Sequence, residues 1–139
     1  MSDLPSVIEF SEDVSKAEAP PLLPAGVYEA QISTVEPKVS VHSGNKYASV
    51  MFRIMPDHFP PDYDASFYPD GKLLAYNRVL LEDTPQARFR LRNFLDAIQA
   101  KGGKSIDVGT WVGLSAMVEV SHGSYEGTDK EELGRVTSV

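Results

Sequence analysis

Apolar and polar residues alternate with a period of two along several stretches of the chain, which is the spacing of half-buried β-strands. Turn residues at Ser43-Gly44-Asn45 and a proline at Pro56 separate these stretches. A polar loop over 121–134 precedes the last of them. The predicted strands are Val27 to about Pro37, 47–54, Leu73–Leu81, Trp111–Val120 and Arg135–Val139.

Between the third and fourth strands the apolar spacing changes to that of a helix. Thr84-Pro85 supplies a capping hydroxyl followed by proline at the first helical position. One apolar stripe follows, made of Ala87, Leu91, Phe94, Leu95 and Ile98. Lys101-Gly102-Gly103 predicts the end of the helix, with a cation in the last turn and glycine in a left-handed cap.

Three strands, one helix and two strands form the chain order of the OB-fold, a five-stranded Greek-key barrel with its helix between strands three and four. We therefore predict a mainly β, OB-like domain over 26–139. Residues 1–25 are acidic and contain the run Pro20-Pro21-Leu22-Leu23-Pro24, so they are predicted to form an N-terminal arm. Another small antiparallel sheet or sandwich with one packed helix is the alternative.

Charge is unevenly distributed along the chain. The 139 residues hold 13 Lys and Arg against 20 Asp and Glu, a net charge of −7, which argues against coating of nucleic acid by bulk charge. Residues 1–25 hold one base and five acids (net −4), whereas 78–104 hold six bases and three acids (net +3). Because part of the chain is basic, the net negative charge does not exclude a polyanionic ligand.

The absence of cysteine and the hydropathy of the chain exclude several further classes of protein. The absence of cysteine excludes a disulfide framework, a thiolate zinc site and a cysteine nucleophile. No apolar run approaches the ~18 residues of a membrane span, and the first residues do not resemble a signal peptide. We expect a cytoplasmic protein with no membrane partner.

Catalytic chemistry has one candidate cluster. The histidines His42, His58 and His122 lie far apart in sequence, without the spacing of a zinc site. Clustered carboxylates at Asp57, Asp62 and Asp64, with His58, have the chemistry to hold Mg²⁺ for phosphodiester cleavage. They lie in a proline-rich loop, where acids are commonly solvated. We predict no enzyme, no catalytic residue, no metal and no cofactor, and keep a metal-dependent nuclease as an alternative.

An OB barrel binds single strands across strands two and three, between the loops joining strands 1–2 and 4–5. Aromatic rings there stack on bases, and cations neutralise phosphates. The alternation predicts these outward side chains on the two strands: Tyr47, Arg53, Tyr76 and Arg78. It predicts these inward ones on the third: Leu73, Ala75, Val79 and Leu81. The predicted nucleic-acid-binding residues are Lys38, Lys46, Tyr47, Arg53, Tyr76, Arg78, Trp111 and Tyr125.

Each of these residues also has a packing interpretation. A single aromatic residue in a strand usually serves packing, and Trp111 has the size to plug one end of a barrel. Tyr28 shares its phase with Ala30 and Ile32, so it is assigned to the core. The set Arg88, Arg90 and Arg92 is predicted to be mainly a solvated helix flank with one ion pair between Arg92 and Asp96, and phosphate contact is its alternative role.

Several short motifs over residues 22–139 carry a family resemblance. They are Leu23-Pro24-Ala25-Gly26-Val27-Tyr28-Glu29-Ala30, Gly44-Asn45-Lys46-Tyr47, Arg88-Phe89-Arg90-Leu91, Phe94-Leu95-Asp96-Ala97, Trp111-Val112-Gly113-Leu114 and Tyr125-Glu126-Gly127. In these motifs the chain resembles phage-encoded single-stranded-DNA-binding proteins of the OB type. The resemblance supports a nucleic-acid-binding role at Lys46, Tyr47, Trp111 and Tyr125.

The resemblance implies a protein that coats single strands during phage DNA replication or recombination in the host cytoplasm, alone or as a homo-oligomer. Many such proteins recruit replication or recombination proteins through an acidic C-terminal tip. This chain departs from that pattern, because Arg135–Val139 contains no acid. Its acidic stretch is the N-terminal arm, which either competes with DNA for the basic groove or only solubilises the protein.

A protein-binding module is the alternative to DNA binding. Aromatic residues and arginine are what protein interfaces prefer, and four aromatics cluster in the loop after the second strand: Phe59, Tyr63, Phe67 and Tyr68. A phage structural or accessory protein of the same fold would use them as an oligomer interface.

Overall fold

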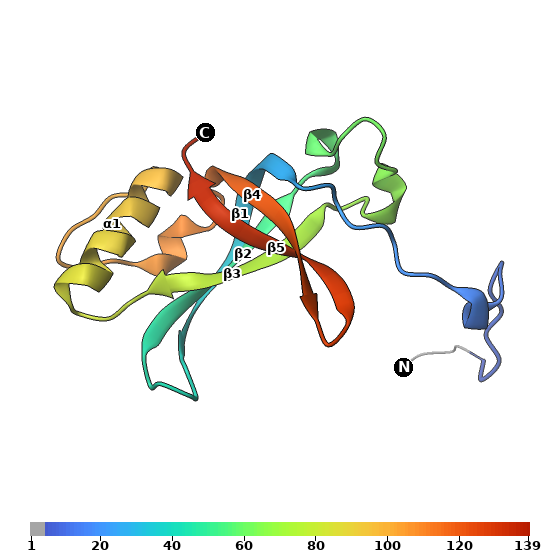
Figure 1. The fold of residues 1–139 in the computed structure, drawn as a ribbon, viewed down its shortest axis with the longest axis horizontal. Coiled ribbons are helices and arrows are strands. Elements are labelled where there is room, and N and C mark those ends of the chain that lie inside the picture. The colour runs from blue at the N-terminus through green and yellow to red at the C-terminus, as the bar shows by residue number, and fades with distance from the viewer. Residues whose placement is uncertain (1–4) are drawn as a thin grey trace.

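The computed structural model describes residues 5–139, the side chain of Tyr125 excepted, and consists mainly of one five-stranded antiparallel sheet (Figure 1). The strands are β1 (Gly26–Val39), β2 (Lys46–Ile54), β3 (Lys72–Leu80), β4 (Ser115–Tyr125) and β5 (Thr128–Thr137). Their order in the sheet is β3-β2-β1-β4-β5. Among the described strands no backbone pairing links β3 to β5, so the sheet is open and the closed barrel stays a prediction.

One α-helix, α1 (Pro85–Ile98), lies between β3 and β4 in the described part of the chain, as predicted. Thr84 Oγ1 accepts a hydrogen bond from the Ala87 N–H at 3.1 Å, which confirms the predicted cap. Short 3₁₀ turns complete the structure: η1 (Val14–Lys16), η2 (Pro56–His58), η3 (Ala65–Phe67) and η4 (Val108–Trp111). The described helices are all too short or too polar to cross a membrane.

The core lies between the inner face of the sheet and α1. On β2 the predicted alternation is confirmed, since its inward residues are completely buried: Ala48, Val50, Phe52 and Ile54. The helix contributes Phe94, Leu95 and Ile98 from the predicted stripe, all less than a tenth exposed. Burial of this apolar stripe supplies the main attraction between helix and sheet.

The ends of two elements differ from the predictions. The helix ends at Ile98, and Gln99 rather than a glycine adopts the left-handed conformation, with φ 60°. The Ala100 N–H then donates to the Leu95 carbonyl at 2.8 Å and satisfies the last turn. The predicted polar loop over 121–134 is wrong, because β4 and β5 form a long hairpin turning at Glu126-Gly127. This hairpin is largely polar, so apolar alternation does not reveal it.

Each edge strand contains a β-bulge. Asn77 and Arg78 of β3 together oppose Ser49 of β2, and an equivalent extra residue in β5 falls at Gly134 and Arg135, opposite Glu119. A bulge inverts the phase of the residues beyond it. The bulges thus decide which side chains of both edge strands face the core.

The β3 bulge overturns part of the predicted face assignment. Tyr76 pairs with Val50 and faces the core, so its outward placement was wrong. Leu73 and Ala75 face outward, opposite to the prediction, and Leu73 is 45% exposed. Val79, beyond the bulge, is buried as predicted.

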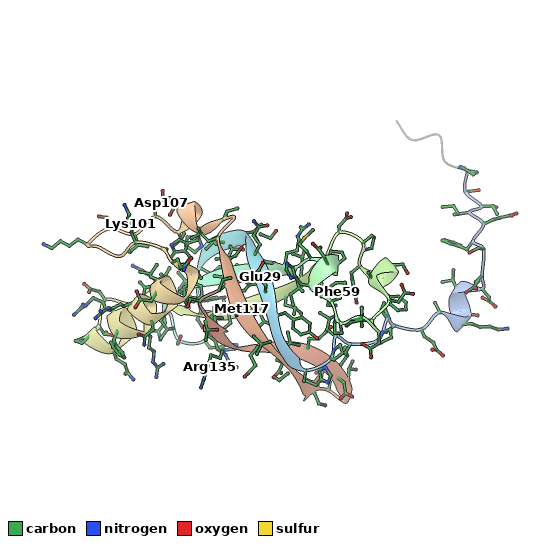
Figure 2. The ribbon with its side chains drawn as sticks, turned by 90° about the horizontal axis from the view of Figure 1, so that it is seen from above. Glu29, Phe59, Lys101, Asp107, Met117 and Arg135 are labelled. Carbon is green, nitrogen blue, oxygen red and sulfur yellow. The ribbon has the colours of Figure 1, made fainter. Side chains whose placement is uncertain are left out.

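The last residues of the predicted arm pack onto the sheet. Leu23 is completely buried in the core. Its N–H donates to Glu131 Oε2 at 3.1 Å, and its carbonyl lies 2.6 Å from His122 Nε2. The arm leaves the domain at the end opposite α1 (Figure 1). Figure 2 places Phe59 at this end of the sheet and Lys101 at the other. Residues 1–4 of the predicted arm lie outside the described residues.

We call residues 21–24 the arm root. Two tyrosines hold it by hydrogen bonds, and their ionisation is expected to lower the stability of the protein at alkaline pH. The hydroxyls of Tyr28 and Tyr63 donate to the carbonyls of Pro24 and Pro21, each at 2.6 Å, and burial raises both pKa values above the usual 10.0. The unfolded chain therefore releases these protons first, so the stabilisation is complete below about pH 10 and lost as the pH rises through the raised pKa.

We expect the thermal unfolding midpoint, followed by circular dichroism, to fall as the pH rises above about 10. Replacing Tyr28 and Tyr63 together by phenylalanine should flatten this fall. Burial also raises the pKa of Tyr76, which keeps part of the dependence in that variant. An equal fall in the double variant would show that the arm root does not titrate.

Candidate nucleic-acid interface

Three of the predicted binding residues share the outward face of β1 and β2. The register sets Lys38 directly opposite Tyr47, and Gln31 opposite Arg53, in the outward phase of both strands. Tyr47 is half-buried and Lys38 is exposed. Lys46 begins β2 at the same hairpin, exposed but in the other phase. The β1–β2 hairpin thus carries one aromatic ring and two ammonium groups, although Lys46 lies in the opposite phase from Lys38 and Tyr47.

The cations of this face have weak partners. Lys38 Nζ lies 3.8 Å from Glu36 Oε2, and both side chains are exposed, so the pair is worth little in water and is readily exchanged for a phosphate. Arg53 Nη1 donates to the Asp70 carbonyl at 3.0 Å. Gly71, with φ +93°, leaves the room that the Arg53 stem occupies, since a Cβ there would lie 2.8 Å from Arg53 Cγ. Arg53 is thereby fixed in place with further donors available.

Tyr76 and Trp111 do not belong to the outward face. Tyr76 stacks on Phe94 with ring centroids 5.9 Å apart and meets Phe52 edge-on at 6.2 Å. Trp111 is 1% exposed, and its ring centroid lies 5.5 Å from that of Phe94. It sits in η4 rather than in a strand, so strand alternation does not apply to it. Its predicted outward phase was wrong, and base stacking is closed to it in this structure. The side chain of Tyr125 lies outside the described residues; its main chain ends β4.

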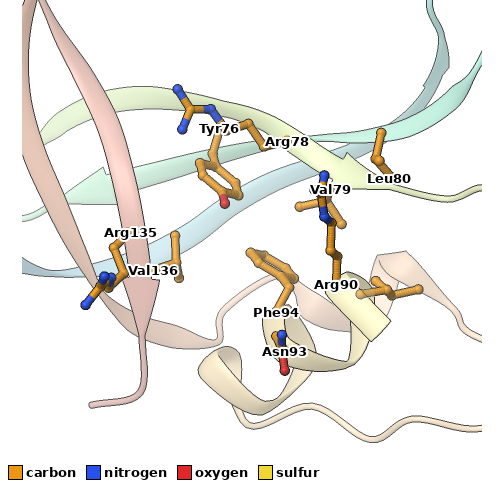
Figure 3. Close-up of a pocket in the computed structure, with 10 residues that line it drawn as sticks. Tyr76, Arg78, Val79, Leu80, Arg90, Asn93, Phe94, Arg135 and Val136 are labelled. Atoms are coloured by element: carbon orange, nitrogen blue, oxygen red, sulfur yellow. The ribbon is translucent and has the colours of Figure 1, made fainter. Parts of the chain in front are cut away.

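A cleft of about 340 Å³ opens where β3, α1 and β5 meet (Figure 3). Its rim holds Arg78 of β3, Arg90 of α1 and Arg135 of β5, and its floor holds Tyr76 and Phe94. The other lining residues are neutral: Val79, Leu80, Leu91, Asn93 and Val136. We call this feature the arginine cleft. Arg78 also lines this cleft, and the register sets it together with Asn77 opposite Ser49, so it keeps the outward position that the sequence predicted.

The sequence predictions missed Arg135, and they gave Arg90 mainly to a solvated helix flank. Arg135 reaches the cleft because the β5 bulge and the long β4–β5 hairpin bring it there, and the local signals that could have shown them are Gly134 within the strand and Gly127 at the turn. Arg90 lines the arginine cleft, whereas Arg88 and Arg92 of the same helix do not. Arg88 pairs with Asp83 across the start of the helix, in place of the predicted pair between Arg92 and Asp96.

The loop between β2 and β3 uses its aromatics internally. Phe59, Tyr63 and Phe67 pack edge-on in succession, with centroids 5.4 and 6.1 Å apart. Tyr68 lies under the Lys72 ammonium, 4.3 Å from its ring centroid. Of the four residues offered for an oligomer interface, Phe67 is the most exposed, at 42%, whereas Phe59 is buried and Tyr63 and Tyr68 are half-buried. This packing weakens the basis of the protein-interface alternative.

The predicted carboxylate cluster does not assemble. Asp64 accepts hydrogen bonds from the Ser66 N–H and hydroxyl at 3.0 and 2.7 Å, which lower its pKa and cap η3. His58 turns instead to Glu29 of β1, at 3.3 Å. Among the described residues no group of three histidine, aspartate or glutamate side chains could hold a metal ion. The nuclease alternative therefore has no assembled site in this part of the chain.

Comparison with known proteins assigns the chain to no family. No protein-family model and no curated protein sequence matches the chain.

Proposed function

We propose that this protein binds single-stranded DNA without catalysing a reaction, as a domain of the OB type. The chain order supports this, with a helix between the third and fourth of five antiparallel strands. OB-folds are partly open Greek-key barrels, and here the two edge strands β3 and β5 line one cleft. Their proximity is what a partly open barrel requires.

The observation that carries the proposal is the cross-strand pair of Lys38 and Tyr47 on the outward face, with Arg53 on the same strand. A half-buried ring offers a flat surface to any base, and the adjacent cations neutralise phosphates with release of counterions. Duplex DNA keeps its bases stacked on one another, so it gains only the electrostatic part. Such contacts favour single strands without sequence preference.

The biological role we propose follows from the family resemblance, which is to phage proteins. Coating keeps exposed strands unpaired during DNA replication or recombination. With a net charge of −7 the protein as a whole repels DNA, so local cations and stacking have to supply the attraction. We propose a salt-sensitive, sequence-tolerant coating protein that acts in the host cytoplasm.

Tyr47→Ala is expected to weaken binding of a labelled poly-pyrimidine oligonucleotide by roughly five- to 150-fold in fluorescence anisotropy, since one stacked base is worth about 1–3 kcal/mol. Tyr47→Phe keeps the ring and should bind as the original protein does. Unlabelled duplex should fail to displace the strand. If the original protein binds no single strand even at low salt, the proposed function is wrong.

A further inference from the structure

We propose that the arginine cleft is a second contact for nucleic acid, where the phosphodiester backbone of a strand leaving the outward face crosses the free edge of β3 and meets Arg78, Arg90 and Arg135. This inference rests on the proposed function and extends its path. It assigns a ligand class, a flexible polyanion, to a site on the helix side of the sheet.

Charge is the first argument. Three elements distant in sequence each send one arginine to the same rim, and among the described residues that line the cleft none is aspartate or glutamate. Ion pairs in the described part of the chain use other cations, among them Lys38, His58, Lys72 and Arg88. In a protein of net charge −7, three guanidiniums around a cleft without carboxylates in its lining attract anions locally.

The arrangement of these cations selects the kind of anion. In Figure 3 the three guanidinium groups stand apart and do not meet at one point, and that of Arg78 lies on the side of β3 away from the Tyr76 ring. A single phosphate would require them to converge, whereas a backbone presents phosphates in series. The cleft volume of about 340 Å³ lies at the small end of ligand pockets, so it admits a nucleotide unit rather than a folded partner.

The floor suits the same ligand. The rings of Tyr76 and Phe94 are nearly parallel, with 11° between their planes, and packing against Phe52 and Trp111 holds this pair rigidly. A preformed aromatic floor costs little ordering entropy when a ligand binds. The Tyr76 hydroxyl is a hydrogen-bond donor at neutral pH, as any tyrosine hydroxyl is.

Continuity with the outward face is the last argument. Leu80 is the register partner of Tyr47 and also lines the cleft. A strand stacked on Tyr47 therefore has to cross only β3, the edge strand, to reach Arg78. The bulges of β3 and β5 occur at Arg78 and Arg135, the positions where the two edge strands contribute their cations.

Edge protection is the competing explanation. Charged residues on exposed edge strands block edge-to-edge pairing, and Arg78 and Arg135 lie on the two edges of this sheet. That role predicts self-association once the charges are removed, and no change in DNA binding. The two explanations therefore separate in one experiment.

The experiment compares oligo-dT of about 4 and about 16 nucleotides, the range of OB site sizes, by anisotropy at several salt concentrations. For Arg90→Ala with Arg135→Ala we expect the longer strand to bind on the order of tenfold more weakly and its log–log salt slope to fall by about 1.4, because each single-strand contact contributes about 0.7. The short strand should be unaffected. Arg92→Ala, on the same helix but outside the cleft, is the matched control.

The charge-preserving variant Arg90→Lys with Arg135→Lys should keep the slope, which separates lost contacts from lost folding. Unchanged binding of the longer strand to the alanine variant overturns the inference and leaves the proposed function intact. Equal losses for both lengths also overturn it, because the cleft would then be part of the primary site. Binding of neither length to the original protein overturns the proposed function itself.

Discussion

Replacing Trp111 by alanine is expected to lower the free energy of unfolding by about 3–5 kcal/mol, the cost of removing a large aromatic side chain from a core. Trp111 is 1% exposed and contacts Phe94, which stacks on Tyr76. The truncation would leave a cavity between η4 and α1 and loosen the floor of the arginine cleft. Urea unfolding followed by circular dichroism measures the change.

The control for this prediction is Val112→Ala, since Val112 follows in the chain and is 51% exposed. It should cost less than about 0.5 kcal/mol, as exposed substitutions do. Trp111→Phe should keep DNA binding in the folded protein, because the ring acts by packing. A loss of binding in that variant without a loss of stability would restore base stacking to Trp111.

Leu23→Ala is expected to cost about 2–5 kcal/mol, although the residue belongs to a stretch whose composition predicts a detached arm. Leu23 is completely buried, and its main chain is held by Glu131 and His122. Glu131 is in turn paired with Lys72 at 3.7 Å, with both side chains mostly buried. Loss of the leucine leaves a void beneath these polar groups, so the effect should resemble that of a core substitution.

Truncation locates the boundary of this effect. Removing residues 1–20 should leave the urea midpoint within experimental error, because the described arm residues before Pro21 are exposed. Removing residues 1–25 should destabilise the protein at least as much as Leu23→Ala. Equal stability of the two truncated proteins would show that the arm root contributes nothing to the domain.

The sequence pattern correctly predicted the buried face of β2 and the start of α1, because both depend only on residues close together in the chain. Strict alternation on β2 predicted its buried residues, and Thr84-Pro85 predicted the start of α1, since a cap needs only neighbours in the chain. The outward placement of Tyr47 and Arg53 followed from the same alternation. These features needed no knowledge of the partner strands.

Features that depend on contacts between distant segments could not be predicted from local spacing. A bulge is defined by the strand opposite, so nothing within β3 shows that Tyr76 turns inward. The polar β4–β5 hairpin pairs through its main chain, and its sequence resembles a loop. The arginine cleft combines both, because it needs the bulges, the hairpin and the docking of α1 to bring its three cations together.

Leu23 also makes the arm a tether with a fixed attachment point. Even fully extended, the 16 residues from Pro5 to Pro20 span at most about 55 Å. The 14 residues of β1 extend away from this point for up to about 45 Å, toward the β1–β2 hairpin. The effective concentration of the arm's carboxylates is therefore high around its own end of the sheet and low at Lys38 and Tyr47. Neighbouring molecules on a coated strand would meet these acids more often than the protein's own binding face does.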